Sequence, residues 1–290
     1  MNLNEPLILA TCGACSGIIT KTIIAPLERV KLLYQVQNYY GKNEYISLRQ
    51  SLSKILLEDG IKGLYYGNGA NIIRILPVYS LKFMFNDLYK TFFLNKNQSI
   101  KDITFKQLMM SGMLAGISQS TITYPLETIR TRLSIDNNMG RYNGIINCGI
   151  HTVKKEGIKA LYKGYSVTFL STPIYVGLQM SLYEIFKRQI KENNISGNYT
   201  ILCMLCGASA GLIAQTTAYW GDTIKKQMQT DGIKQKKYTG LYDCVTKIYK
   251  KNGIKGFYPG IKLNSIKCIP EASIQFVVYD ICKTYLYNYK

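Results

Sequence analysis

The sequence predicts an all-α protein in which six transmembrane helices form one bundle with threefold pseudosymmetry, joined by short amphipathic helices. Short motifs recur three times at intervals of about a hundred residues, which is typical of tandem structural repeats. Each repeat also holds two long apolar segments on either side of a basic linker. With 47% hydrophobic and 18% charged residues, the chain is too apolar to be a disordered basic segment.

Each repeat has an anchor in which an acidic residue stands three positions before a basic residue. A Gly-xxx-Gly pair precedes each anchor by thirteen residues, and a Gly-Ile-Lys motif and an acidic-xx-Lys motif follow it at nearly constant offsets. Chance does not align four motifs in three copies. We therefore expect three repeats of one integral membrane domain, over residues 1–97, 98–194 and 195–290. The anchors are Pro26-Leu-Glu28-Arg-Val-Lys31, Pro125-Leu-Glu127-Thr-Ile-Arg130 and the weaker Trp220-Gly-Asp222-Thr-Ile-Lys225.

Six apolar segments are each long enough to cross a bilayer, which takes about 20 residues. A proline in the middle of every segment except the fifth predicts kinked helices, which are tolerated where neighbouring helices or a water-filled cavity satisfy the freed carbonyls. The paired glycines of the odd-numbered segments permit close contact between helices. These features together predict a bundle around a polar cavity. The segments cover residues 7–37, 68–94, 105–135, 164–188, 199–230 and 261–287.

An excess of 36 Lys and Arg over 17 Asp and Glu gives a net charge of +19, which indicates nucleic acid, anionic lipid or an anionic ligand as a partner. Much of this charge falls in the three linkers. The positive-inside rule then places all linkers on one face of the membrane and both termini on the other. Helical spacing in the second linker predicts an amphipathic helix along the surface, through Ile145, Ile146, Ile150, Val153 and Ile158.

The sequence gives little sign of a metal or catalytic site. Cys12/Cys15 and Cys203/Cys206 are spaced like zinc ligands, but both pairs lie in apolar runs without a nearby histidine. The single histidine, His151, falls in a linker, and the chain has no nucleophile elbow or Walker loop. We expect a protein that is not an enzyme and that binds no metal or cofactor.

Two sets of charges recur at matched offsets and predict two gates. Within each anchor the acid and the base share one helix face, so three converging helices would bring six charges into one ring: Glu28, Lys31, Glu127, Arg130, Asp222 and Lys225. A second set would form a ring at the other end: Asp87, Lys90, Glu184, Lys187, Asp280 and Lys283. Two rings that form and break in turn are what alternating access requires.

Equivalent positions that differ between repeats predict the ligand site, because an asymmetric substrate needs an asymmetric surface. Thirteen residues before the second-set carboxylates stand Arg74, Ser171 and Lys267. Two cations and a hydroxyl suit a ligand with an anionic end and a neutral or aromatic end. Lys21 adds a third cation, and we expect all three cations to be unpaired inside the bundle and therefore functional.

Two further residues of the fourth segment suit the neutral end of such a ligand. Tyr175 can stack on a planar base, and Thr172 can hydrogen-bond it. With 24 tyrosines in the chain, plain packing of Tyr175 is nearly as good an explanation.

The repeated Pro-x-[Asp/Glu]-x-x-[Lys/Arg] and [Phe/Tyr]-[Asp/Glu]-x-x-[Lys/Arg] motifs resemble those of the mitochondrial carrier family, also called solute carrier family 25, across essentially the whole chain. The resemblance implies an inner-membrane location, short amphipathic helices on the matrix side, a matrix gate from the first charge set and a cytoplasmic gate from the second. It further implies that Gln35 braces the matrix gate and that Tyr183 and Tyr279 brace the cytoplasmic one. Asn86 stands where the first repeat normally has an aromatic residue.

Within the family, the run from Lys21 to Gln37 resembles the first helix of ADP/ATP carriers. This resemblance implies that Lys21, Arg74 and Lys267 hold phosphates and that Ser171, Thr172 and Tyr175 line an adenine pocket. Trp220 in place of proline is a departure from the pattern, and the run from Lys267 to Phe276 resembles coenzyme A and ATP-Mg/phosphate carriers at least as well.

We therefore expect an ADP/ATP-type antiporter, with a carrier of coenzyme A, adenosine bisphosphate or ATP-Mg/phosphate as the alternative. A basic helical-repeat protein that binds nucleic acid would explain the charge but not the six apolar segments. The family resemblance also implies cardiolipin bound at helix N-termini, next to Gly144, Gly164 and Gly240. We expect a monomer without a nucleic-acid partner.

Overall fold

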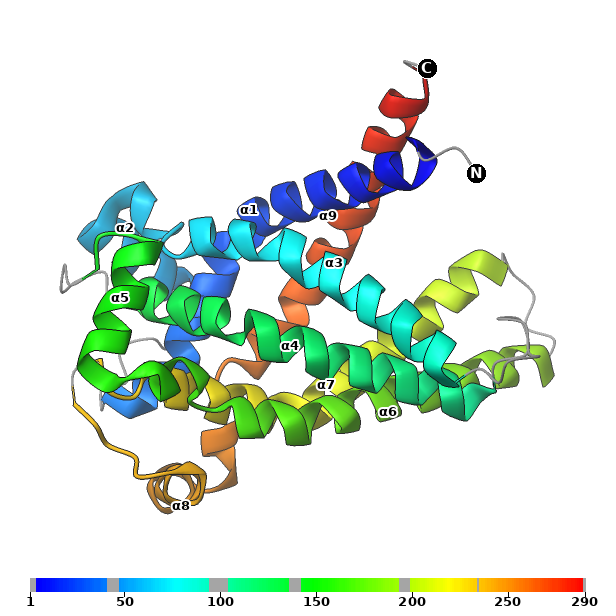
Figure 1. The fold of residues 1–290 in the computed structure, drawn as a ribbon. Coiled ribbons are helices and arrows are strands. Elements are labelled where there is room, and N and C mark those ends of the chain that lie inside the picture. Colours follow the sequence, from blue (N-terminus) through cyan, green and yellow to red (C-terminus); the bar gives the residue numbers. More distant parts are fainter. Residues whose placement is uncertain are drawn as a thin grey trace.

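The computed structural model describes residues 4–40, 47–93, 104–135, 142–192, 199–233 and 235–288, and the regular secondary structure of these residues is entirely helical (Figure 1). The all-α prediction is confirmed. Six long helices match the six predicted apolar segments: α1 (Asn4–Tyr40), α3 (Asn68–Phe93), α4 (Phe105–Ile135), α6 (Tyr165–Glu192), α7 (Tyr199–Thr230) and α9 (Ile261–Asn288).

Within the described part of the chain, no helix combines the length and the hydrophobicity that a membrane crossing requires.

Short helices connect the two long helices of each repeat. They are α2 (Leu48–Gly63), α5 (Ile145–Glu156) and α8 (Leu241–Asn252), and the 3-10 turns η3 (Ile158–Tyr162) and η4 (Ile254–Phe257) follow α5 and α8. Figure 1 shows these short helices at one end of the molecule and both chain ends at the other. In α5, Cys148 and Thr152 are buried while Ile146 and Ile150 are exposed, as the amphipathic spacing predicts.

Neighbouring repeats pack through their long helices. The helix α3 lies along α4, α6 along α7, and α1 along α9, which closes the circle between the first and third repeats. Two buried apolar clusters lie near the linker helices. One joins α1, α2 and α9 through Val30, Leu33, Ile55 and Leu263. The other joins the end of α1 to α6, α7 and α8 through Tyr39, Val167, Ile224, Tyr238, Cys244 and Ile248.

The second long helix of each repeat (α3, α6 and α9) begins directly after a glycine with a positive φ angle. The φ angles are 80° at Gly67, 83° at Gly164 and 78° at Gly260, a region that favours glycine. A Cβ atom at these positions would lie 3.0, 3.2 and 3.6 Å from the backbone oxygens of Arg130, Lys225 and Lys31, respectively. Each of these three helix starts therefore packs against the first long helix of another repeat (α4, α7 or α1), by the same contact three times.

A polar cluster joins the second linker to the end of α7. The fully buried Arg132 donates to both carboxylate oxygens of Glu156 and to the backbone oxygens of Gln229 and Asp231. Lys163 donates to Glu156 at 2.8 Å and to the Asp231 backbone oxygen at 2.9 Å. Burial raises the pKa of Glu156, but the hydrogen bonds from Arg132 and Lys163 outweigh it and the pKa falls below its usual value.

Replacing Gly67 with alanine should destabilise the protein by about 2 kcal/mol or more, because a Cβ there combines left-handed backbone strain with overlap on the Ser134 hydroxyl. Gly69, two residues further on, is helical and has open space where a Cβ would go. Gly69→Ala should therefore be neutral or stabilise by about 0.5–1 kcal/mol. Thermal unfolding of the purified variants measures the difference, and equal effects would contradict the assigned contact.

Replacing Glu156 with glutamine should lower stability by about 2 kcal/mol at neutral pH, because it leaves the guanidinium of Arg132 without its carboxylate. Since the folded-state pKa of Glu156 is lowered, its contribution is present above the ordinary glutamate pKa of about 4.3 and is lost as pH falls through the folded value. Thermal unfolding between pH 7 and pH 3 should show this loss in the parent and not in the variant. Glu58→Gln, at an exposed pair with Lys54, is the matched control and should change little.

Candidate functional site

Three ion pairs join α1, α4 and α7 into a closed ring. Glu28 pairs with Arg130, Glu127 pairs with Lys225 at 3.0 Å, and Asp222 pairs with Lys31 at 3.3 Å. Each pair joins two different repeats, so the acid of every anchor is held by the base of another anchor. The structure thus brings together all six charges of the first set, and we call these three pairs the anchor ring.

The first long helix of two repeats carries a proline just before its anchor acid. Pro26 lies inside α1 and Pro125 inside α4, each two residues before the anchor acid. In α7 the proline position holds Trp220, and the following Gly221 is buried against α6, where a Cβ would lie 2.6 Å from the Cβ of Ser171. A close helix approach at Gly221 therefore accompanies the departure from proline in the third repeat.

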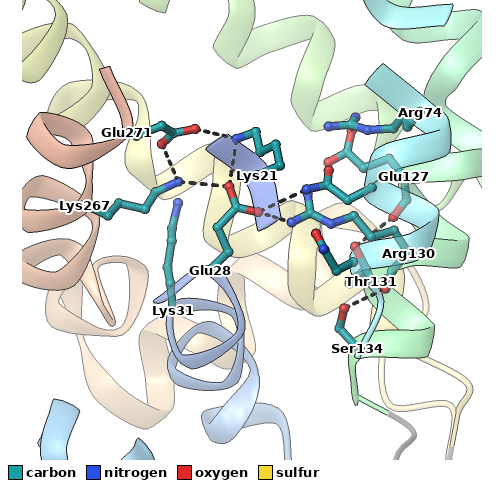
Figure 2. Close-up of polar contacts among 12 residues, drawn as sticks. Lys21, Glu28, Lys31, Arg74, Glu127, Arg130, Thr131, Ser134, Lys267 and Glu271 are labelled. Carbon is teal, nitrogen blue, oxygen red and sulfur yellow. Dashed lines mark hydrogen bonds and ion pairs between the residues drawn. The ribbon is translucent and has the colours of Figure 1, made fainter. Parts of the chain in front are cut away.

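The prediction that Lys21, Arg74 and Lys267 are unpaired is wrong. Arg74 lies 3.3 Å from Glu127, so it shares a carboxylate with the anchor ring. Lys21 and Lys267 lie 2.8 and 3.4 Å from the same oxygen of Glu28. Figure 2 shows Glu28 between these two lysines on one side and Arg130 on the other. The prediction fails for two reasons. Lys21 and Lys267 have acids within reach on their own helices, Glu28 and Glu271. Arg74 pairs with Glu127 on another helix.

Two charged residues at this site were not predicted from the sequence. Glu271 of α9 contacts both Lys21 and Lys267 (Figure 2). Lys226 lies 2.9 Å from Glu127, which therefore faces Lys225, Lys226 and Arg74 together. The sequence held a signal for each residue. Glu271 is a charged residue directly after Pro270 of α9, and Lys226 is a second lysine next to the anchor residue Lys225.

Two neighbouring cavities lie against the anchor ring. The first, of about 170 Å³, is lined by all six anchor charges together with Lys226 and Lys267. The second, of about 220 Å³, is lined by Ser171, Thr172 and Tyr175 of α6. Asp222 and Lys225 line both cavities. The structure therefore brings the three predicted pocket residues of α6 together and sets them beside a strongly charged cavity.

Gln35 is buried and lines the first cavity. Its backbone oxygen accepts a hydrogen bond from the Gln227 side chain, and its own amide nitrogen has no hydrogen-bond partner among the described residues.

The second charge set is arranged differently. Asp87, Glu184 and Asp280 are exposed, and Lys187 lies over the ring of Tyr183 with 5.7 Å between the ammonium nitrogen and the ring centre. Tyr279 and Lys90 are half-buried, and the side chain of Lys283 lies outside the described residues. Among the side chains that the structure describes, no ion pair joins members of this set, in contrast to the anchor ring.

The three glycines predicted at lipid sites occupy helix starts. Gly144 and Gly240 are the N-cap residues of α5 and α8, and Gly164 directly precedes α6. Gly144 has a φ angle of 94°, whereas Gly240 is extended.

Comparison with known proteins finds a match to the family described as mitochondrial carrier protein, over residues 4–97, 101–194 and 197–290. A relative named mitochondrial carrier protein CoAc1, from Arabidopsis thaliana, is 32% identical over 94% of this chain and 88% of its own length. The mitochondrial adenine nucleotide transporter ADNT1 of the same plant is also 32% identical, over 94% and 85%. The human mitochondrial adenyl nucleotide antiporter SLC25A24 is 33% identical over 93% of this chain, which spans 56% of that protein.

Reversing the charges of one anchor pair should test the ring. Lys31→Asp and Asp222→Lys should each lower the unfolding temperature, and the double variant should recover part of the loss, with a coupling energy of about 1 kcal/mol or more because the pair joins two helices. The same cycle at the exposed pair Arg188 and Glu192 is the control and should give less than about 0.5 kcal/mol. Equal coupling in the two cycles would contradict a special role for the anchor pair.

Proposed function

The chain belongs to the mitochondrial carrier family, and on that premise we propose that it exchanges adenine nucleotides across the mitochondrial inner membrane by ADP/ATP-type antiport. One observation carries the proposal: a cavity rich in lysine and arginine adjoins a pocket formed by Ser171, Thr172 and Tyr175. Phosphates are bound by clustered cations, and a planar base stacks on an aromatic ring. The names of the adenine nucleotide transporter and the adenyl nucleotide antiporter among its relatives support the same substrate class.

In this proposal Lys21, Arg74 and Lys267 hold the phosphates of the nucleotide. Lys267 lines the first cavity, and Lys21 and Arg74 adjoin it through Glu28 and Glu127, which line it. Each of the three cations contacts an anchor carboxylate in the structure, Glu28 or Glu127. A phosphate that binds these cations must therefore compete with the carboxylates that also hold Arg130 and Lys225. Substrate binding would therefore change which cations the anchor carboxylates contact, and a ligand shifts a conformational equilibrium only through such differential contacts.

We assign the anchor ring as the matrix gate, braced by Gln35. The second charge set would form the cytoplasmic gate in the opposite state, with Tyr183 and Tyr279 as braces. Its members are Asp87, Lys90, Glu184, Lys187, Asp280 and Lys283. Because the anchor ring is closed and the second set is unpaired among the described side chains, the structure would represent the state that is closed toward the matrix.

The six long helices would span the membrane as one domain of three repeats, residues 1–97, 98–194 and 195–290, acting as a monomer. The short helices would lie along the matrix surface with their exposed leucine, isoleucine, valine and tyrosine side chains in the lipid interface. Cardiolipin phosphates would bind at the helix starts next to Gly144, Gly164 and Gly240, where backbone N–H groups are free to face an anion.

Coenzyme A is the second candidate substrate. The resemblance of the α9 sequence to coenzyme A and ATP-Mg/phosphate carriers favours it, and the relative named CoAc1 is similar over most of both chains. Coenzyme A shares the adenosine and phosphate groups of the nucleotides, so the same two cavities would serve both ligands.

The test is uptake by proteoliposomes loaded with ADP. We expect labelled ADP and ATP to enter in exchange for internal ADP, and Arg74→Ala to lower the rate at least tenfold because it removes a phosphate ligand. Lys82→Ala removes an exposed cation from the same helix and should leave uptake near that of the parent. Labelled coenzyme A in parallel vesicles separates the second candidate from the first.

Uptake that needs no internal nucleotide would contradict antiport. Undiminished exchange by Arg74→Ala would contradict the phosphate site, and uptake of coenzyme A without uptake of ADP or ATP would favour the second candidate.

A further inference from the structure

Glu271 places a carboxylate in the half of the site formed by α1 and α9. It lies one turn beyond Lys267 on α9, directly after Pro270, and its side chain is 21% exposed. Its two oxygens are divided between two cations, since one contacts Lys21 and the other lies 3.2 Å from Lys267.

Four charges in this half of the site form a closed square. Lys21 and Lys267 each contact both Glu28 and Glu271, so every cation has two anionic partners and every carboxylate has two cationic ones (Figure 2). The formal charge of the square is zero. A phosphate group that approaches Lys21 and Lys267 therefore meets two cations that already have partners.

The two carboxylates of the square differ in what else they do. Glu28 also holds Arg130 in the anchor ring, and an acid stands at its position in all three anchors. Glu271 stands nine residues before Asp280, and the equivalent positions in the other repeats hold Val78 and Tyr175. The threefold mechanism thus requires no acid at this position, and an ionisable residue inside a membrane bundle is by default a functional hypothesis.

From this geometry we propose that Glu271 is a specificity-determining residue that sets how many negative charges a bound ligand can carry. It contacts both Lys21 and Lys267 in the structure, and a ligand phosphate must displace it. After displacement its charge remains within a few ångströms of the ligand, so each additional negative charge on the ligand is penalised by repulsion. The identity of the ligand rests on the proposed function, but the charge dependence applies to any ligand whose phosphates reach these lysines.

Glu271→Gln keeps the size of the side chain and removes its charge. The variant should bind anionic ligands more tightly, and the gain should grow with ligand charge because repulsion scales with the product of the charges. We expect tripolyphosphate to gain about tenfold in affinity, inorganic phosphate to gain about twofold and pyrophosphate to fall between them.

The primary experiment uses these three anions, which carry no adenosine. Protection of the purified full-length protein against thermal unfolding is titrated in metal-free buffer, and the half-maximal concentrations are compared. Glu192→Gln removes a carboxylate from an exposed pair with Arg188 and is the matched control. Its half-maximal anion concentrations should equal those of the parent. Glu271→Asp restores the charge and should return the order of affinities toward that of the parent.

Equal gains for all three anions, or no gain relative to Glu192→Gln, would overturn the proposal. If Glu271→Gln does not fold, Glu271→Val replaces it, since valine is the residue that the first repeat carries at this position. The same expectation and the same contrary result apply to that variant.

A second set of measurements separates this proposal from the proposed function. Inhibition of labelled ADP exchange by AMP, ADP and ATP should show the ratio of ATP to AMP affinity rising about tenfold in Glu271→Gln. If the parent exchanges no nucleotide but the inorganic anions behave as expected, the proposed function fails and the role of Glu271 stands. If exchange occurs and the charge dependence is unchanged, the role of Glu271 fails alone.

Discussion

The anchor ring is the interaction on which the rest of this structure depends. Each repeat contributes one acid and one base, and every base pairs with an acid of another repeat. The ring therefore closes only when α1, α4 and α7 converge. The same level is fixed a second time by the glycines that start α3, α6 and α9, which seat those helices against the backbone oxygens of the ring's own cations. Ion pairs between side chains and close backbone contacts therefore hold all six long helices together at one level of the bundle.

The ring shares its carboxylates with Lys21, Arg74 and Lys267, the proposed phosphate ligands. Under that proposal, closure of the ring and binding of a phosphate are not independent. Glu28 serves Arg130 on one side and Lys21 and Lys267 on the other, and Glu127 is divided in the same way among Arg74, Lys225 and Lys226. A phosphate that binds Lys21 or Arg74 frees Glu28 or Glu127 to pair more strongly with the ring cations Arg130 and Lys225. The same phosphate also adds negative charge next to these carboxylates, which opposes that gain. Which of these effects prevails depends on ligand charge, and the balance of charges at the site determines how the ring responds.

Much of the fold could be predicted from the sequence, because repeated offsets and helical periodicity are local properties of the chain. The six anchor charges followed from the same repetition. Glu271 and Lys226 could not be identified in this way, since neither recurs in the other repeats. Lys226 lies 99 residues from its partner Glu127 along the chain, and Glu271 has one local partner, Lys267, and one distant partner, Lys21. The supposed isolation of Arg74 failed for the same reason, because its partner Glu127 lies on another helix. Lys21 and Lys267, in contrast, each have one partner on their own helix, Glu28 and Glu271.

The threefold scaffold becomes selective only where its repeats differ. One position carries Val78 in the first repeat, Tyr175 in the second and Glu271 in the third, so equivalent places around the bundle offer an apolar, an aromatic and an acidic side chain. Tyr175 lines the pocket beside α6, whereas Glu271 lies with the lysines of α1 and α9. Under the proposed function, a ligand with a planar base at one end and phosphates at the other would bind in one orientation only. The reversed orientation would place its phosphates in the pocket of Tyr175 and leave Lys21 and Lys267 paired with Glu28 and Glu271. Asymmetry at a few positions is thus sufficient to orient a ligand within a symmetric frame.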